Sequence, residues 1–182
     1  THCPRPDEIL AINDREHDVF YAAKVADKSF FSLRPKKHTR SKMMKVISKY
    51  KKSRSGHHIL LSGFGSAQSE LNHQEYARQL THSKIVLCPR GNFEETYRVM
   101  ESVRAGCVVI CDKLPKRWYY KDHPVIEISD WRTLPKLLDT LLQEPDTLST
   151  YQQKSLQWWE NTVSEKAVAQ YVGAQIQVLD QA

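Results

Sequence analysis

Two short, almost wholly apolar runs place the strongest constraint on the fold: residues 84–88 (KIVLC) and 107–111 (CVVIC). A strand with one face in water alternates apolar and polar residues, whereas a strand covered on both faces is apolar throughout. A charged segment with helical spacing separates the two runs. The sequence therefore predicts two neighbouring strands of a parallel sheet that has helices on both faces.

The same alternation of strand and helix continues on either side of these runs. Further strands are predicted at 18–23 (DVFYAA), 125–128 (VIEI) and within 58–65 (HILLSGFG). Helices are predicted at 39–52, 72–83, 131–143, 148–161 and 164–179, because apolar residues recur there every three or four positions. This order predicts an α/β fold with a Rossmann-like, doubly wound parallel sheet flanked by helices.

The length of the chain fits one domain. A chain of 182 residues can bury roughly 70% of its unfolded surface, which is enough for a core without disulfides or metals. Residues 1–16 are polar and are predicted to be a lead-in or the remnant of a linker, and residues 17–182 to be the domain. The chain begins at Thr1 rather than at methionine, so we expect it to be excised from a longer protein.

A polar turn follows the first apolar run and contains Arg90, Gly91 and Asn92. Ligands of open parallel sheets bind outside the carboxyl ends of the strands, where this turn is predicted to lie. Gly91 permits a close backbone approach or a positive φ. The amides at the start of the next helix attract anions. The turn is therefore a candidate phosphate site.

The helix predicted after the turn carries Glu94, Arg98 and Glu101 on one face, since 94 and 101 differ by about 20° in helical direction. A carboxylate at 101 suits the two hydroxyls of a ribose, and Arg98 suits a phosphate. Glu94 and Arg98 could equally form an ordinary surface pair. Tyr97 and Met100 are predicted to pack the helix.

Residues 83–112 resemble the nucleotide-sugar-binding half of exostosin-like glycosyltransferases, and also the related capsule-associated protein O-glucosyltransferases. In that family a strand ends in Cys-Pro-x-Gly, and Ser or Thr, Arg and Glu follow on a helix before Ala-Gly-Cys and another strand. The resemblance extends over about residues 18–172. The matching residues are Leu87, Cys88, Pro89, Arg90, Gly91, Thr96, Arg98, Glu101, Ala105, Gly106 and Cys107.

The resemblance implies the C-terminal lobe of a GT-B glycosyltransferase, which binds a nucleotide-sugar donor for transfer to a polysaccharide or glycoconjugate. The glutamate matching Glu101 would bind the ribose, and the glycine turn with Arg98 would face the diphosphate. Asn92, Glu94 and Thr96 are expected in the same donor site. An N-terminal partner lobe, outside this chain, is also implied.

One departure from the family pattern concerns the mechanism. Retaining GT-B enzymes often carry a second glutamate eight positions before the one matching Glu101, but that position here is Phe93 and the nearest acid is Glu94. This departure favours inversion. The chain has no Asp-x-Asp, so neither a metal nor another cofactor is predicted, and the helix and arginine would neutralise the leaving diphosphate.

The general base of an inverting enzyme is expected in the partner lobe. Asp112, Asp122 and His123 are local candidates, although structural or exposed roles are favoured for all three. The alternative function is a non-catalytic, Rossmann-like binding module whose basic helix contacts nucleic acid or an anionic surface. That class would not need the glycine turn, Arg98 and Glu101 together.

Residues 34–54 contain ten basic residues and no acidic one, in a chain of net charge +6. Such a segment attracts phosphate-bearing partners. A solvated helix face, contact with an acceptor or an anionic membrane surface, and nucleic-acid binding are the alternatives. No recognised nucleic-acid motif favours the last.

The four cysteines do not form a disulfide framework, because three of them fall in or beside predicted core strands. No run approaches the ~20 apolar residues of a membrane span. We therefore expect a cytoplasmic enzyme, in some settings peripheral to a membrane, with a lumenal lobe cut from its anchor as the alternative.

Overall fold

The computed structural model describes residues 9–22, 39–54, 56–62, 73–91 and 93–179. Their strands form one sheet in the order β2-β1-β3-β4-β5, and every neighbouring pair is parallel. The predicted parallel sheet is therefore confirmed. The strands are β1 (His17–Ala22), β2 (Ile59–Ser62), β3 (Ser83–Cys88), β4 (Val108–Asp112) and β5 (Ile126–Ile128).

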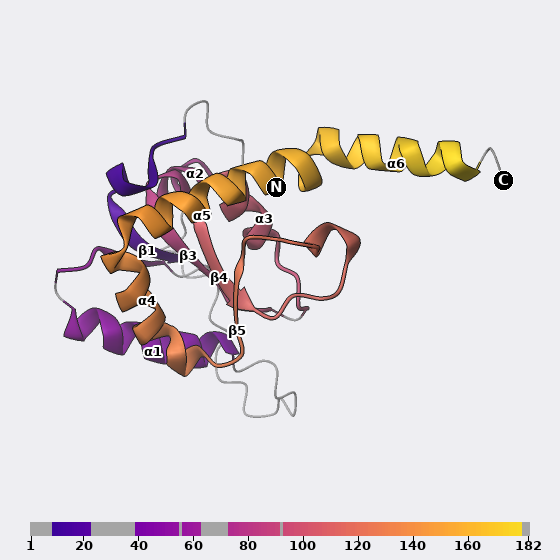
Figure 1. Cartoon of the computed structure of the whole chain (residues 1–182). Helices are drawn as coiled ribbons and strands as arrows, with labels where there is room; N and C mark the ends of the chain where they lie inside the picture. Colours follow the sequence, from indigo (N-terminus) through magenta and orange to yellow (C-terminus); the bar gives the residue numbers. More distant parts are fainter. Residues whose placement is uncertain (1–8, 23–38, 55, 63–72, 92, 180–182) are drawn as a thin grey trace, which may run out of the picture.

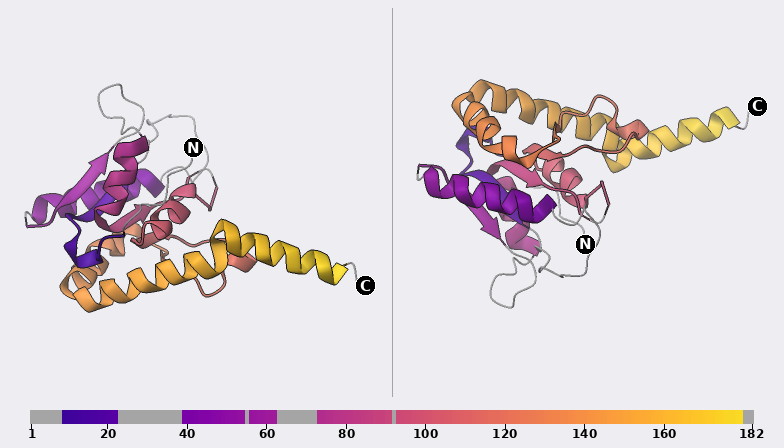
Figure 2. Two further views of the ribbon diagram at one scale, coloured as in Figure 1. Left: turned by 90° about the horizontal axis from the view of Figure 1, so that it is seen from above. Right: turned by 90° about the horizontal axis from the view of Figure 1, so that it is seen from below.

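Helices cover both faces of this sheet (Figures 1 and 2). On one face α1 (Thr39–Ser53) and α4 (Leu134–Gln143) bury apolar side chains against the odd-numbered positions of β1 and β3. On the other face α2 (His73–Thr81) and α3 (Tyr97–Arg104) pack on the even-numbered positions of the same strands. Both faces of the central strands are buried, which explains why their sequences are apolar throughout.

Helix α5 (Pro145–Trp158) links the two layers. Leu148, near its start, belongs to the core on the α1 and α4 face. Trp158 and Trp159, at its end, belong to the core on the α3 face. Both tryptophans are buried.

The residues before β1 are integrated into the domain. Ile12, in the short helix η1 (Ile12–Asp14), is buried, and its amide donates to Gln152 Oε1 at 3.0 Å. The buried guanidinium of Arg15 donates to the carbonyls of Ser83 at 2.9 Å and Ala105 at 2.8 Å. The division at residue 16 stays a prediction for residues 1–8, whereas residues 9–16 pack against the sheet.

Helix α6 (Glu165–Leu179) extends away from the rest of the domain (Figures 1 and 2). A π-helical turn (Trp159–Val163) precedes it, and the ring of Tyr171 stacks on Trp118 at 3.9 Å. Trp118 begins the short helix η3 (Trp118–Tyr120). Within the described ranges, no helix is long and apolar enough to cross a membrane.

Candidate functional site

The order of the strands locates the candidate site. β1 lies between β2 and β3, so the chain leaves β1 in one direction and later returns on its other side. Doubly wound sheets bind ligands at such a switch point, outside the carboxyl ends of the strands. Here those ends carry Tyr21, Ala22 and Cys88, and the turn after β3 contains Arg90 and Gly91.

Asp112 holds the turn after β3 in place. One carboxylate oxygen of Asp112 accepts the amide of Arg90 at 2.7 Å, and the other accepts the indole N–H of Trp131 at 3.1 Å. Trp131 opens the short helix η4 (Trp131–Thr133) and is buried. Asp112, one of the local candidates for a general base, thus has a structural role in this geometry.

Glu94 does not lie on the helix, and the prediction of a shared helical face with Arg98 and Glu101 is wrong. Helix α3 begins at Tyr97, after Thr96 in extended conformation (φ −128°, ψ 137°). Glu94 precedes the helix, and its exposed carboxylate lies 3.4 Å from the guanidinium of Arg90. The chain bends between the turn and the helix, so helical spacing does not extend back to residue 94.

Gly91 makes room for an arginine from another helix. A Cβ atom at Gly91 would lie 2.8 Å from Nη2 of Arg40, closer than side chains normally approach. Arg40 lies in the first turn of α1, which begins at the carboxyl edge of the sheet. Of the two roles predicted for Gly91, close approach is therefore the one seen, and the group that approaches is the guanidinium of Arg40.

Arg40 and Arg98 lie close enough at this edge for each charge to act on the other, and Arg90 belongs to the adjoining turn. Nε of Arg90 and Nη1 of Arg98 are buried and find no hydrogen-bond acceptor in the part of the chain that the structure describes. Burial lowers the pKa of Arg40; Tyr21 opposes this effect, and the like charge of Arg98 adds to it. Buried donors without acceptors are costly, so this edge is suited to an anion.

Tyr21 lies beneath the arginines at the end of β1. Its side chain is fully buried, and its hydroxyl has no partner among the described residues. Burial raises the pKa of Tyr21, although the charges of Arg40 and Arg98 act in the opposite direction. The phenol is therefore neutral at physiological pH and offers the site a further hydrogen-bond donor.

Glu101 lies one turn along α3 from Arg98, and Tyr76 of α2 fixes its carboxylate. The hydroxyl of Tyr76 donates to Oε2 of Glu101 at 2.9 Å. Burial and the charge of Glu101 raise the pKa of Tyr76 well above its ordinary value, so Tyr76 stays a donor. The carboxylate retains lone pairs for other hydrogen-bond donors.

The structure thus places Gly91 against Arg40 and Arg40 near Arg98, with Glu101 on the adjoining turn of α3, whereas the side chain of Arg90 pairs with Glu94. Thr96 is the residue before the helix, and its buried hydroxyl has no partner among the residues described. Asn92 lies outside the described residues.

The sequence analysis missed Arg40, Tyr21 and Tyr76 as members of this site. One available signal was topological. A helix that follows a parallel strand begins near the carboxyl edge of the sheet, so the first turn of the helix after β1 had to border the site. No signal in the sequence paired Tyr76 with Glu101.

An aromatic cleft of about 400 Å³ opens beside the start of α3. Its wall includes Tyr97, which is 90% exposed, so the prediction that Tyr97 packs the helix is wrong. The hydroxyl of Tyr119 donates to Glu95 at 2.6 Å across the cleft. In the described ranges no cluster of three or more His, Cys, Asp or Glu side chains could hold a metal ion.

Comparison with known proteins identifies the family. Residues 29–175 match the family model described as the RXYLT1 C-terminal domain. The chain belongs to this family. Over 87 residues, or 47% of its length, the chain is 33% identical to Exostosin-1a of Danio rerio. It spans only 11% of that protein.

Two solved structures are also similar to this chain, each with a TM-score of 0.49. One is the C-terminal domain of the glycosyl transferase group 1 family protein LpcC from Francisella tularensis, with 16% identity over 72% of this chain and 66% of that chain. The other is TarM, with 10% identity over 95% of this chain and 37% of that chain.

The family match and the similarity to Exostosin-1a confirm the predicted resemblance to the C-terminal lobe of exostosin-like glycosyltransferases. The predicted fold class is confirmed by the parallel sheet and its flanking helices. The protein is therefore a glycosyltransferase-like domain.

Proposed function

We propose that this domain binds the nucleotide-sugar donor of a glycosyltransferase that acts on a polysaccharide or glycoconjugate. The observation that carries the proposal is the position of Arg40, against Gly91 and near Arg98, at the carboxyl edge of β1 and β3 beside Glu101. A nucleoside diphosphate presents two phosphates next to a ribose. This edge offers cationic forks next to a carboxylate.

The diphosphate would lie over Gly91, against the guanidinium groups. Planar guanidinium groups bind phosphate oxygens in pairs, and Nε of Arg90 and Nη1 of Arg98 are buried donors that such oxygens would satisfy. The first amides of α3 add partial positive charge. During transfer these groups would stabilise the charge that develops on the departing diphosphate, which is the basis for proposing a metal-independent reaction.

The ribose would bind to Glu101. Because Tyr76 already occupies part of Oε2, the carboxylate is held in one orientation and its remaining lone pairs accept the two ribose hydroxyls. The general base of an inverting transfer would come from an N-terminal partner lobe, since the carboxylate of Asp112 is engaged in the turn.

Helix α1 is proposed to contact the acceptor or a membrane. Its lysines, at 42, 45, 49, 51 and 52, are exposed on one surface of the domain. This surface supports contact with an anionic glycan or an anionic membrane. A cytoplasmic, membrane-peripheral location stays a prediction.

Calorimetric titration with UDP, GDP, CMP and inorganic pyrophosphate tests the donor site. Saturable binding of one nucleotide is expected, and Arg98→Gln should weaken it by at least about tenfold because a charged hydrogen bond is lost. Glu101→Gln should weaken binding of the same nucleotide but leave binding of pyrophosphate unchanged, since Glu101 is assigned to the ribose. EDTA should change neither binding constant.

Two exposed residues provide matched controls. Arg132→Gln removes a guanidinium that pairs with Asp130 on the surface, and Glu16→Gln removes an exposed carboxylate. Neither should alter nucleotide binding. If the chain binds no nucleotide, or if Arg132→Gln weakens binding as much as Arg98→Gln, the assignment of this edge to the donor is wrong.

A further inference from the structure

The outer face of α1 carries a row of four exposed lysines. They are Lys42, Lys45, Lys49 and Lys52. Their spacing of three, four and three residues places all four within about 80° around the helix axis, in a row about 15 Å long. The opposite face of α1 packs in the core through Met43, Ile47 and Tyr50. The row therefore points away from the core, and α1 lies in front of the rest of the domain when it is seen from below (Figure 2, right).

No acidic side chain of the described residues neutralises this row. None of the four lysines forms an ion pair within the described ranges. Asp139, on the neighbouring α4, pairs with Arg54 at 2.8 Å. Asp130, just before η4, pairs with Arg132 at 2.7 Å, and this bond lowers the pKa of Asp130 more than the charge of Lys42 does. Both acids are thus already engaged by arginines.

The row differs in composition from an ordinary solvated helix face. Such faces mix acidic and basic residues, because opposite charges three or four positions apart stabilise a helix and like charges destabilise it. Here each neighbouring pair in the row is a like-charge pair, and α1 contains no acidic residue. The helix therefore bears a repulsion that an anionic partner would relieve.

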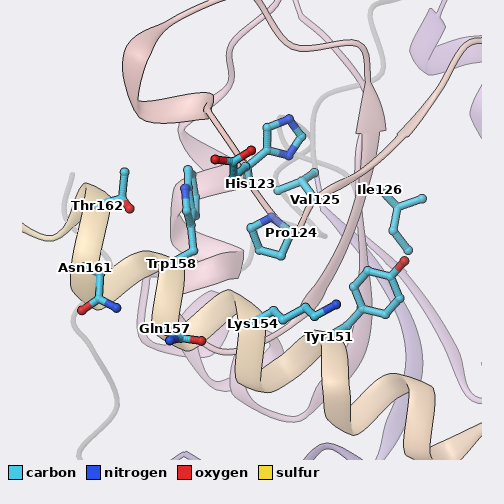
Figure 3. A pocket seen from close by; sticks show the side chains of 11 residues that line it. His123, Pro124, Val125, Ile126, Tyr151, Lys154, Gln157, Trp158, Asn161 and Thr162 are labelled. Atoms are coloured by element: carbon cyan, nitrogen blue, oxygen red, sulfur yellow. The ribbon is translucent and has the colours of Figure 1, made fainter.

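The shape of this face favours an extended partner over a small molecule. Small-molecule sites are concave. Neither the aromatic cleft beside α3 nor a groove of about 590 Å³ between α5 and residues 122–126 (Figure 3) includes a residue of α1. A row of charges on the convex side of a helix fits a surface whose negative charge is spread over many groups.

The residue types in the row favour lipid headgroups over nucleic acid. Nucleic-acid surfaces add arginine forks and exposed aromatic rings, which pair with bases or stack on them. The row contains neither, since Tyr50 is buried and Arg54 is paired with Asp139. Anionic bilayers attract clusters of exposed lysines, and each lysine near the surface raises the affinity about fivefold.

We propose that α1 docks this domain on a membrane rich in anionic phospholipids through the lysine row. Lys42 follows two residues after Arg40, whose guanidinium approaches Gly91, so the row begins at the carboxyl edge of the sheet. A membrane that lies along α1 would therefore border this edge. The consequence that the donor is presented beside the bilayer rests on the proposed function, whereas the membrane contact itself does not.

Flotation with lipid vesicles tests the proposal. The vesicles contain phosphatidylcholine alone or phosphatidylcholine with about one third phosphatidylglycerol. We expect the chain to float with the anionic vesicles only. Raising the salt from about 0.1 M to about 1 M should release it, because the screening length falls from ~10 Å to ~3 Å. RNA and dextran sulfate, supplied at the same concentration of negative charge, should bind more weakly than the anionic vesicles.

Replacing two lysines in the middle of the row tests its role directly. Lys45→Gln with Lys49→Gln should weaken vesicle binding by at least about tenfold. The matched control, Lys154→Gln with Lys166→Gln, removes the same charge from exposed positions of α5 and α6 and should leave vesicle binding nearly unchanged. The first pair should be at least as stable to urea as the unaltered chain, because it removes like charges from one helix face.

The proposal is overturned if neutral vesicles bind the chain as well as anionic ones, if RNA or dextran sulfate binds more tightly than anionic vesicles, or if the two pairs of variants have equal effects. UDP titration of the unaltered chain reports on the donor edge separately. Vesicle binding without UDP binding would support the membrane contact and contradict the donor site. UDP binding without vesicle binding would do the opposite.

Discussion

The hydroxyl of Tyr76 on α2 donates to the carboxylate of Glu101 on α3 at 2.9 Å, joining two helices that are separated in sequence by β3. This bond fixes Glu101, the one acidic side chain of α3, beside the carboxyl edge of β1 and β3 where Arg40 and Arg98 lie. It also gives Tyr76, a core residue that packs against Phe20 at 6.0 Å, a second role.

Tyr76→Phe should therefore weaken nucleotide binding without removing any group that contacts the nucleotide. The loss of one hydrogen bond to a charged group corresponds to about 1.5–3 kcal/mol, shared between folding and binding. We expect calorimetry to show an affinity several-fold lower and urea unfolding to show reduced stability. Tyr50→Phe is the control, because it removes a similar 2.8 Å bond to Asp139 far from the site. Equal effects of both variants on nucleotide affinity would contradict a positioning role for Tyr76.

Gly91→Ala should affect binding more than stability. Its new Cβ would meet Nη2 of Arg40 at 2.8 Å, and the flexible end of that arginine can move away. We expect weaker pyrophosphate and nucleotide binding with a nearly unchanged urea midpoint. Gly56→Ala is the matched control, because a Cβ there meets nothing within 4 Å. Unchanged pyrophosphate binding in Gly91→Ala would mean that Arg40 does not contribute to the anion site.

Gly106→Ala should reduce stability more than nucleotide binding. Gly106 has a φ of +69°, and a Cβ would lie 3.2–3.3 Å from Leu156, Arg15 and Ile9. The left-handed conformation costs an L-residue about 1–2 kcal/mol before these contacts are counted. We expect urea unfolding to show a loss of at least that size, larger than the effect of Gly173→Ala, whose Cβ would meet nothing within 4 Å. A loss no greater than that of Gly173→Ala would show that the turn relaxes freely.

Asp18 should contribute a stability term that disappears in acid. Burial acts to raise the pKa of Asp18, but Lys84 at 2.8 Å and the amide of His58 outweigh it, so the pKa lies below the ordinary value of 3.8. A group with a lowered folded-state pKa stabilises the protein above its unfolded-state pKa and loses that effect as pH falls through the folded-state value.

The unfolding free energies of the wild type and of Asp18→Asn should therefore differ most above about pH 4 and converge below it. Urea titrations from about pH 7 down to about pH 2.5 measure the difference. Asp146→Asn, at an exposed position in the first turn of α5, is the control. A difference for Asp18→Asn that stays constant across this range would contradict the assignment.

The sequence predicted the sheet well because each central strand is buried on both faces. A strand such as β3, with Ile85 and Leu87 on one core and Val86 and Cys88 on the other, has no polar alternative to its apolar pattern. Helix α4 was equally clear, since Leu134, Leu138 and Leu141 all face the same core. In both cases burial leaves a direct record in residue type.

The site was harder to predict because its geometry depends on where helices begin. Helical spacing alone placed Glu94 beside Arg98, but α3 begins three residues after Glu94. Arg40 could not be separated from nine other basic residues of its segment until α1 was positioned against Gly91. Residue spacing predicts the interior of a helix or strand but not where it begins or ends, and this site is formed by the ends of several helices and strands.

Alkylation of the buried thiols of this sheet can report local opening of the domain. Cys88, Cys107 and Cys111 are free and buried, and burial raises the pKa of Cys88 to about 12. A thiol in that state does not react with alkylating reagents until its surroundings separate. Because Cys88 ends β3 beneath the arginines, its rate of alkylation would measure how often this edge of the sheet opens. In a Cys3→Ser chain, a bound nucleotide would slow alkylation of Cys88 more than alkylation of Cys107.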